Sequence, residues 1–430
     1  MQDHAFRGRW TGSDPEILPE EWFLFDLAKI TPSDGDLAHA VTLASTSGFS
    51  WTTAWNLATR LWVHGLVAKN VRDWAELAAL VPRELKPVLA VSQFTARSRQ
   101  TMYVEATTPA FAQLASAGVP LVLLKGAAMI SRYPTGTRLL NDLDLLIRLD
   151  DYAEVAAVLQ ASGFQRVLSK AVSALGKGEE YQLRTDHEMS FVKYSQHPAL
   201  SVDVHWSLLD AHVPLTIDEE ALRSRAVPVQ FGGASMLALS PEDMLIHYGA
   251  QLITDDLTVG FLRLADIHAV VSGGVCWQTL CGDAITAQAA GAVHLALNAA
   301  RLLGVEVPGA VLRTFEDECP GCRLASEIVA EPRWPLGRFR LAGSARNVLT
   351  PLFCSTRYRN ARLKSFPLDA FKYGRRMGRS RFQSILTSLR ASVLTIVSAV
   401  ALLGLWIGKS QRLPVLTRPL RNLLWRKVEG

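Results

Sequence analysis

The sequence predicts an α+β fold, in which a small mixed β-sheet lies between N- and C-terminal helical segments. Short apolar runs bounded by turn residues occur within residues 119–238, and such runs are typical of strands. Helical spacing of apolar residues, with capping residues and glycine stops, marks residues 1–118 and 239–330. Residues 331–430 form a basic tail. A chain of 430 residues is long enough for two or three such units.

The N-terminal segment contains a tryptophan stripe. Ser50 is a suitable N-cap for a helix that ends at Gly65. Trp51, Trp55 and Trp62 then fall on one side of this helix. Because a stripe of this kind is usually buried, we interpret the three tryptophans as core packing residues.

Two further helical stretches flank the predicted sheet. Residues 86–117 form a long helical pattern that Gly118 stops. After the sheet, Ser240 followed by proline is a strong helix start. His247 and Asp266 are polar residues within the apolar segments that follow, and we interpret such residues as structural groups more often than as ligands.

The central stretch places two aspartates on a strand. An apolar run, residues 121–124, breaks at Lys125 and Gly126, which predicts a strand that turns into a helix. A second apolar run carries Asp142 and Asp144, which share one face and lie roughly 6–7 Å apart at their Cα atoms. Like charges this close repel each other, and loss of hydration adds to the cost. A divalent cation would remove that cost, so the pattern predicts a metal site.

A third carboxylate lies on a later strand. Residues 187–194 and 200–206 are two strand-like runs joined by a turn. Alternation in the second run puts Asp203 and His205 on one face and apolar side chains on the other. We therefore expect Asp203 to complete the site.

The arrangement resembles the DNA polymerase beta-type nucleotidyltransferase superfamily, and more narrowly its bacterial uncharacterised nucleotidyltransferase family. The similarity extends over roughly residues 35–310 and does not cover the tail. It implies a small mixed-sheet nucleotidyltransferase core within residues 119–238. The motifs that carry it are Leu124-Lys125-Gly126, Tyr133, Gly136 and Arg138, Asp142-Leu143-Asp144-Leu145-Leu146, and Val202-Asp203-Val204-His205-Trp206.

The resemblance implies metal-assisted transfer of a nucleoside monophosphate from a nucleoside triphosphate, such as ATP, to an acceptor. Asp142 and Asp144 would hold two Mg²⁺ ions ~3.5–4 Å apart. Asp203 would be the third ligand and a candidate base. Carboxylate oxygens and water suit Mg²⁺. The acceptor is an unidentified hydroxyl or phosphate on a small molecule, peptide or polymer.

The phosphate-binding turn departs from the better-known transferases, which carry Gly-Ser or Gly-Gly there. Here Lys125 would supply charge in place of a hydroxyl, or is a solvated residue at a strand end. Gly126 would let the backbone approach the phosphates, or only forms a tight turn. Arg138 either binds phosphate or pairs with a nearby aspartate. His205 would contact substrate or metal-bound water.

Two other functions remain open at this point. The first is a non-catalytic member of the fold that acts as a membrane-associated binding protein. The second is a phosphotransferase that modifies a small molecule or peptide. Neither the acceptor nor the preferred base is readable from the helices around the predicted core, and fold analogy is weak ground for substrate.

The tail has a composition of its own. Residues 331–430 carry 20 of the 45 Lys and Arg residues but 3 of the 40 Asp and Glu residues. Within it, residues 391–408 lack charge, which indicates either a membrane-spanning or interfacial helix or a buried core helix. The basic residues favour an anionic membrane surface or a polyanion. We find no specific nucleic-acid motif.

The remaining signals concern location and thiols. The first ten residues lack the apolar core of a signal peptide, so we expect a cytoplasmic protein, with inner-membrane association through residues 391–408 as an option. Cys319 and Cys322 have the spacing of zinc ligands, and Cys276 and Cys281 are the candidates to complete a four-sulfur site, but no second close pair lies at zinc-ribbon distance. We therefore interpret the five cysteines as reduced thiols.

Overall fold

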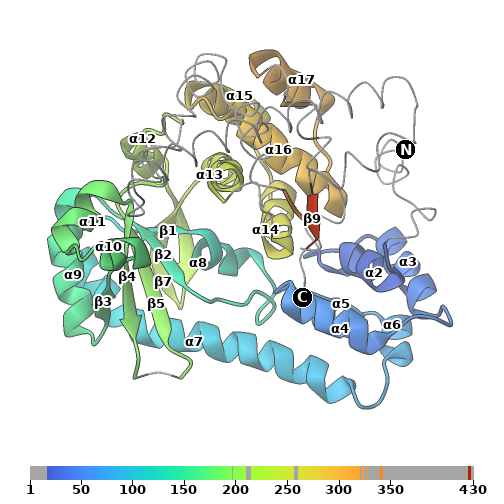
Figure 1. The fold of residues 1–430 in the computed structure, drawn as a ribbon. Helices are drawn as coiled ribbons and strands as arrows, with labels where there is room; N and C mark the ends of the chain where they lie inside the picture. The colour runs from blue at the N-terminus through green and yellow to red at the C-terminus, as the bar shows by residue number, and fades with distance from the viewer. Residues whose placement is uncertain are drawn as a thin grey trace, which may run out of the picture.

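A seven-stranded mixed sheet forms the centre of the molecule, with the strand order β3-β4-β5-β2-β1-β7-β6 (Figure 1). The computed structural model describes residues 17–195, 197–209, 215–255, 260–319, 322–323 and 326, and the backbone of 339–341 and 425–427. The predicted α+β fold is confirmed. The strands are β1 (Val122–Leu124), β2 (Leu143–Leu146), β3 (Gln165–Val167), β4 (Glu188–Lys193), β5 (Leu200–His205), β6 (Val227–Phe231) and β7 (Ala234–Ala238), and β8 (Phe339–Leu341) pairs separately with β9 (Trp425–Lys427).

The middle of the sheet mixes both strand directions. β2 runs parallel to β5 and antiparallel to β1, while β1 runs parallel to β7. Leu143 and Leu145 on β2, and Val202 and Val204 on β5, are fully buried. From Leu200 to Val204 of β5, buried and half-buried residues alternate, as expected from the predicted period of two, whereas all four residues of β2 are buried.

Helix α7 (Lys86–Ser116) links the sheet to the N-terminal helices and continues as one helix through Pro109. Figure 1 shows α7 running below both the sheet and the N-terminal helices. Its buried residues, from Leu89 to Leu114, recur at helical spacing, as expected for a helix with one face toward a core. The N-terminal helices are α2 (Pro19–Leu27), α3 (Asp34–Ala44), α4 (Trp51–Arg60), α5 (His64–Asp73) and α6 (Ala75–Leu80).

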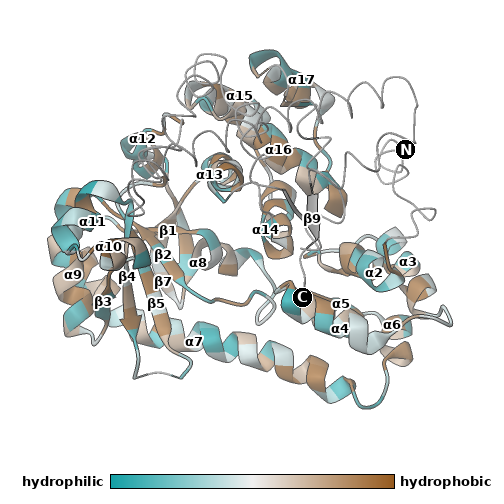
Figure 2. Cartoon of the chain, in the orientation of Figure 1, coloured by the Kyte–Doolittle hydropathy of each residue, from teal (hydrophilic) through white to brown (hydrophobic). Residues whose placement is uncertain are grey.

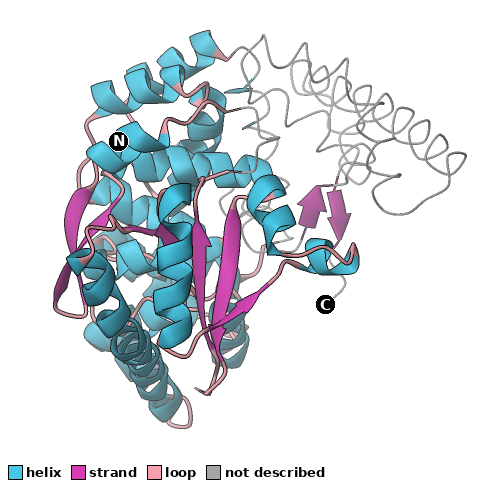
Figure 3. Ribbon diagram, turned by 90° about the vertical axis from the view of Figure 1, so that its left-hand side faces the viewer, coloured by secondary structure: helices cyan, strands magenta, loops and turns pink. Residues whose placement is uncertain are grey.

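Further helices surround the strands (Figure 3). Ser240 caps α13 as predicted, since its hydroxyl accepts a hydrogen bond from the backbone amide of Asp243. Figure 2 shows hydrophobic residues along α13, α14 and α16, and all eleven residues of α16 are buried. These helices are α8 (Lys125–Met129), α9 (Tyr152–Ala161), α10 (Lys170–Ala174), α11 (Glu179–Thr185), α12 (Glu219–Ser224), α13 (Pro241–Thr254), α14 (Phe261–Ser272), α15 (Trp277–Thr286), α16 (Ala290–Ala300) and α17 (Gly309–Glu318).

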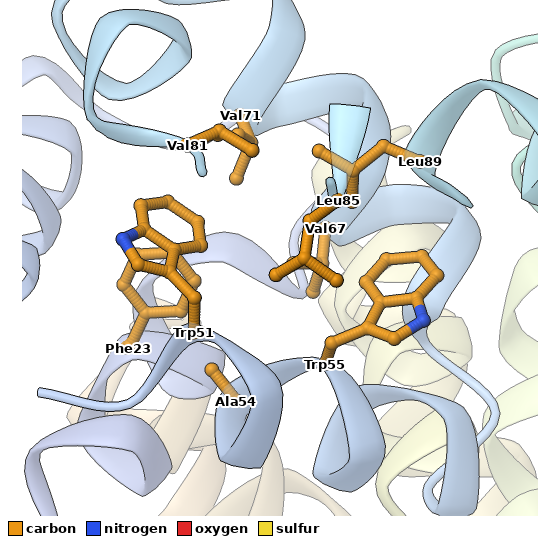
Figure 4. A pocket seen from close by; sticks show the side chains of 9 residues that line it. All are labelled: Phe23, Trp51, Ala54, Trp55, Val67, Val71, Val81, Leu85 and Leu89. Atoms are coloured by element: carbon orange, nitrogen blue, oxygen red, sulfur yellow. The ribbon is translucent and has the colours of Figure 1, made fainter. Parts of the chain in front are cut away.

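A small apolar pocket lies among the N-terminal helices (Figure 4). Trp51 and Trp55 form part of its wall, in agreement with their predicted packing role. Trp62 does not share that role, and its prediction as a core residue is wrong. Helix α4 ends at Arg60, and Trp62 has a φ of +62° and is 47 % exposed. The pocket is lined by Phe23, Trp51, Ala54, Trp55, Val67, Val71, Val81, Leu85 and Leu89.

The membrane question concerns residues outside the described part of the chain. Residues 391–408, the uncharged stretch of the tail, are among those that the structure does not describe. Among the helices that it does describe, none has the length and apolar character needed to cross a bilayer.

Candidate functional site

The sheet brings the three predicted aspartates together. Asp144 on β2 is the direct register partner of Asp203 on β5. Asp142 lies one residue before β2 and two residues before Asp144. Because β2 and β5 are parallel neighbours, both strands enter the sheet from the same end, and the carboxylates gather there.

Asp144 is the most constrained of the three. Its side chain is buried, and Oδ1 accepts a hydrogen bond from Lys125 Nζ at 2.7 Å and lies 3.0 Å from His205 Nε2. Burial alone would raise the pKa of Asp144, but Lys125 and His205 together hold it well below its usual range. Asp144 is therefore ionised at neutral pH.

Lys125 reaches Asp144 from the junction between β1 and α8. Its φ of +44° is uncommon for a residue with a Cβ atom, and it marks an abrupt change of direction at this position. Burial would lower the pKa of Lys125, but the nearby Asp144 raises it, and the net change is upward. The predicted strand-to-helix turn thus presents an ammonium group directly to the carboxylates.

The other two carboxylates are less acidic than usual. Asp142 reaches the surface, yet partial loss of hydration and the negative charges of Asp144 and Asp203 raise its pKa to about 6. Burial raises the pKa of Asp203, although a hydrogen bond from Ser190 lowers it. The charge of Asp144 adds to this rise. Three carboxylates that are costly to ionise together, with oxygen as the only donor atom, fit a hard divalent cation such as Mg²⁺.

Gly126 packs closely against two side chains. A Cβ atom at this position would lie 3.2 Å from Arg138 Nη2 and 3.4 Å from Leu140 Cδ1, so a larger side chain would press on both. The helix that follows the turn has five residues, because the chain passes into a 3₁₀ turn at Ile130. Little dipole accumulates over a helix of a single turn, so its N-terminus attracts anions only weakly.

Of the two roles considered for Arg138, the structure shows the ion pair. Arg138 is buried, and its Nε and Nη2 each donate a hydrogen bond of 2.9 Å to the two carboxylate oxygens of Asp266 on α14. Tyr133 donates to the same carboxylate at 2.7 Å, and Tyr248 lies 3.3 Å from it. Asp266 is thus a structural group, as predicted.

Two further residues lie beside the aspartates: Glu188, which the sequence pattern did not single out, and His247, which it assigned to a structural role. Glu188 on β4 is the register partner of His205, and its Oε2 lies 3.2 Å from His205 Nε2. His247 on α13 is buried, and burial together with the charge of Lys125 lowers its pKa well below the usual value. His247 therefore adds a neutral imidazole beside the charged groups. A predicted register for the β4–β5 hairpin could have identified Glu188.

Arg99 on α7 also escaped prediction, and it holds the backbone of both aspartate-bearing strands. Its guanidinium donates to the carbonyl oxygens of Pro198 and Ala199 at 2.8 and 2.9 Å, just before β5. It also donates to the carbonyl oxygen of Leu140, close to the start of β2, at 3.3 Å. Tyr103, one turn further along α7, donates to the carbonyl oxygen of Asn141.

Comparison with known families agrees with this geometry. The profile of a family described as uncharacterised nucleotidyltransferase matches residues 47–304, which is more than half of the chain. The matched range contains β1 to β7 and all the candidate residues above, and it ends before the basic tail. Among curated proteins, none matches the chain.

Proposed function

Since the chain belongs to the uncharacterised nucleotidyltransferase family, we propose that it transfers a nucleoside monophosphate from a nucleoside triphosphate to an acceptor hydroxyl or phosphate. The observation that carries this proposal is the pairing of Asp144 with Asp203 across β2 and β5, with Asp142 beside them. Carboxylates that repel one another within an apolar sheet lower the free energy of unfolding, and binding of a cation would offset that loss.

Asp142, Asp144 and Asp203 would hold divalent cations, with Mg²⁺ favoured by the all-oxygen donor set. When bound, Mg²⁺ would neutralise phosphate charge and lower the pKa of the attacking hydroxyl. Lys125 would contribute a second positive charge toward the triphosphate, from its place beside Asp144. In the absence of substrate, the same ammonium group neutralises part of the carboxylate charge.

Two side chains have further proposed roles in the reaction. Asp203, whose pKa is raised, would accept the proton of the acceptor hydroxyl. His205 would fix the orientation of Asp144, because its Nε2 lies 3.0 Å from Asp144 Oδ1 in a buried setting. Arg138, which is held by Asp266, would position the turn around Gly126 without contacting phosphate.

The test is calorimetric titration of ATP, GTP, CTP and UTP, with and without Mg²⁺, into the wild type and an Asp142→Asn variant. We expect Mg²⁺-dependent binding of at least one nucleotide to the wild type and at least tenfold weaker binding to the variant. The matched control is Asp150→Asn, which removes an exposed carboxylate beyond the other end of β2 and should bind as the wild type does. Absence of binding to the wild type by all four nucleotides would contradict the proposal.

A further inference from the structure

Two histidines and a glutamate converge at the β4–β5 hairpin, next to the aspartates. His187 immediately precedes β4, Glu188 begins β4 and His205 ends β5. The Nε2 atoms of His205 and His187 lie 3.2 and 3.7 Å from the same oxygen, Glu188 Oε2. One ligand atom from each of the three residues lies within 4.8 Å of the other two. Two imidazoles and one carboxylate thus face a common point.

The surrounding hairpin fixes His187 for this arrangement. Its Nδ1 lies 3.2 Å from Asp186 Oδ1, so the carboxylate can hold the proton on that nitrogen and leave the Nε2 lone pair toward Glu188. Histidines that bind metals usually have such a partner on their second nitrogen. Trp206 holds the same segment, since its indole donates to the carbonyl oxygen of Asp186 at 3.1 Å and its backbone amide donates to that of His187 at 3.0 Å.

The imidazole of His205 lies between two carboxylates, one of which also pairs with Lys125. It is 2 % exposed, and its Nε2 lies 3.0 Å from Asp144 Oδ1 and 3.2 Å from Glu188 Oε2. A single N–H group cannot be directed well at two carboxylates. Within the part of the chain that the structure describes, Nδ1 has no hydrogen-bond partner, so in the metal-free protein the proton lies on Nε2, between the two carboxylates. A cation between Nε2 and Glu188 would bind the nitrogen lone pair and release the Nε2 proton to solvent, which would leave Asp144 paired with Lys125 at 2.7 Å.

From this geometry we propose that His187, Glu188 and His205 form a binding site for a divalent first-row transition metal, such as Zn²⁺. Imidazole nitrogen with one carboxylate suits such ions, whereas the all-oxygen set of Asp142, Asp144 and Asp203 suits Mg²⁺. The site goes beyond the proposed transferase activity, and it requires no nucleotide. Three protein ligands leave coordination positions for water or a substrate group.

The proposal is tested with metal-free, untagged full-length protein in the presence of excess Mg²⁺. Calorimetric titration of Zn²⁺ should show one site in the wild type, weakened at least tenfold in His187→Gln and in Glu188→Gln. Both side chains are partly exposed, at 23 % and 34 %, so these variants should fold. Asp186→Asn should weaken binding by about 10- to 100-fold, because it removes the group that orients His187. A Co²⁺ titration, followed by visible absorption, should show the spectrum of nitrogen and oxygen ligands.

Two controls separate this site from its neighbours. His39→Gln removes a histidine with a comparable carboxylate partner, since His39 Nδ1 lies 2.7 Å from Asp26, and it should leave Zn²⁺ binding unchanged. Asp142→Asn should retain Zn²⁺ even where it loses Mg²⁺-nucleotide binding, so the two proposals can fail independently. Equal Zn²⁺ binding by the wild type and His187→Gln would overturn the proposed site. A thiolate charge-transfer band with Co²⁺ would overturn it as well, by assigning the metal to cysteines.

Discussion

At the scale of single residues, Asp142 and Asp144 show how two aspartates on one strand acquire opposite properties. Asp144 is buried but has Lys125 and His205 as partners, so its pKa falls. Asp142 lacks such close partners among the described contacts and lies near two other carboxylates, so its pKa rises to about 6. Divergent pKa values within one group of carboxylates are typical of functional sites.

Asp142 should therefore destabilise the metal-free protein at neutral pH. Its raised pKa means that the folded state binds more protons than the unfolded state between about pH 4 and pH 6. The free energy of unfolding should then fall as the pH rises from about 4 to about 6, and it should stay at the lower value above that range. Asp142→Asn should remove this fall and stabilise the protein at pH 8 by on the order of 1 kcal/mol, a value reduced by solvent screening of an exposed group.

The measurement is urea unfolding of both proteins at pH 5 and pH 8 in the presence of a chelator. Asp150→Asn serves as the control for the loss of one negative charge, since Asp150 is exposed outside the carboxylate group. If Asp142→Asn were less stable than the wild type at pH 8, the inferred repulsion at this position would be refuted.

At the scale of elements, helix α7 fixes the backbone just before β2 and just before β5. Arg99 contacts carbonyl groups that precede both strands, and it stacks over the ring of Tyr103 at 5.1 Å. One helix side chain thus fixes two segments that are far apart in the sequence. Because Asp142 directly follows one of these segments, the contacts of Arg99 fix the position of the backbone that carries the first aspartate.

Removal of the Arg99 contacts should increase the mobility of these two segments before it affects the rest of the sheet. Arg99→Gln should lower the free energy of unfolding by about 2 kcal/mol, the scale of hydrogen bonds made by a charged group. It should also speed backbone amide exchange in residues 139–142, measured by hydrogen–deuterium exchange. Arg97→Gln on the same helix is the matched control, because Arg97 is exposed. Similar exchange in the two variants would show that Arg99 does not hold this segment.

Local patterns predicted the elements that carry the aspartates, but not their neighbours. Alternation within each strand was sufficient to assign faces to Asp144 and Asp203, because strand side chains have a fixed period. The partnership of Glu188 with His205 depends on the register of a hairpin, and the targets of Arg99 depend on tertiary packing. Neither leaves a pattern in a single strand or helix. The β6–β7 hairpin was also missed, although its glycine pair at 232–233 is a recognised turn signal.

At the scale of the whole molecule, one buried ion pair joins the sheet to the C-terminal helices. Arg138 belongs to the loop between α8 and β2, whereas Asp266 lies on α14. Both side chains are buried, and Tyr133 donates a further hydrogen bond to the carboxylate. Gly126 packs against the same guanidinium, so the turn that carries Lys125 rests on a group that α14 holds in place.

Asp266→Asn should therefore be strongly destabilising. It would leave the Arg138 charge buried without its partner, and loss of one member of such a pair typically costs about 3–5 kcal/mol. Asp255→Asn is the matched control, because Asp255 pairs with Arg263 at 2.7 Å but is 47 % exposed. That pair should contribute about 0–1 kcal/mol. The free energy of unfolding of both variants is measured in urea. Equal decreases in the two variants would mean that Arg138 finds other partners or water. In that case the ion pair would not link the turn at Lys125 to α14.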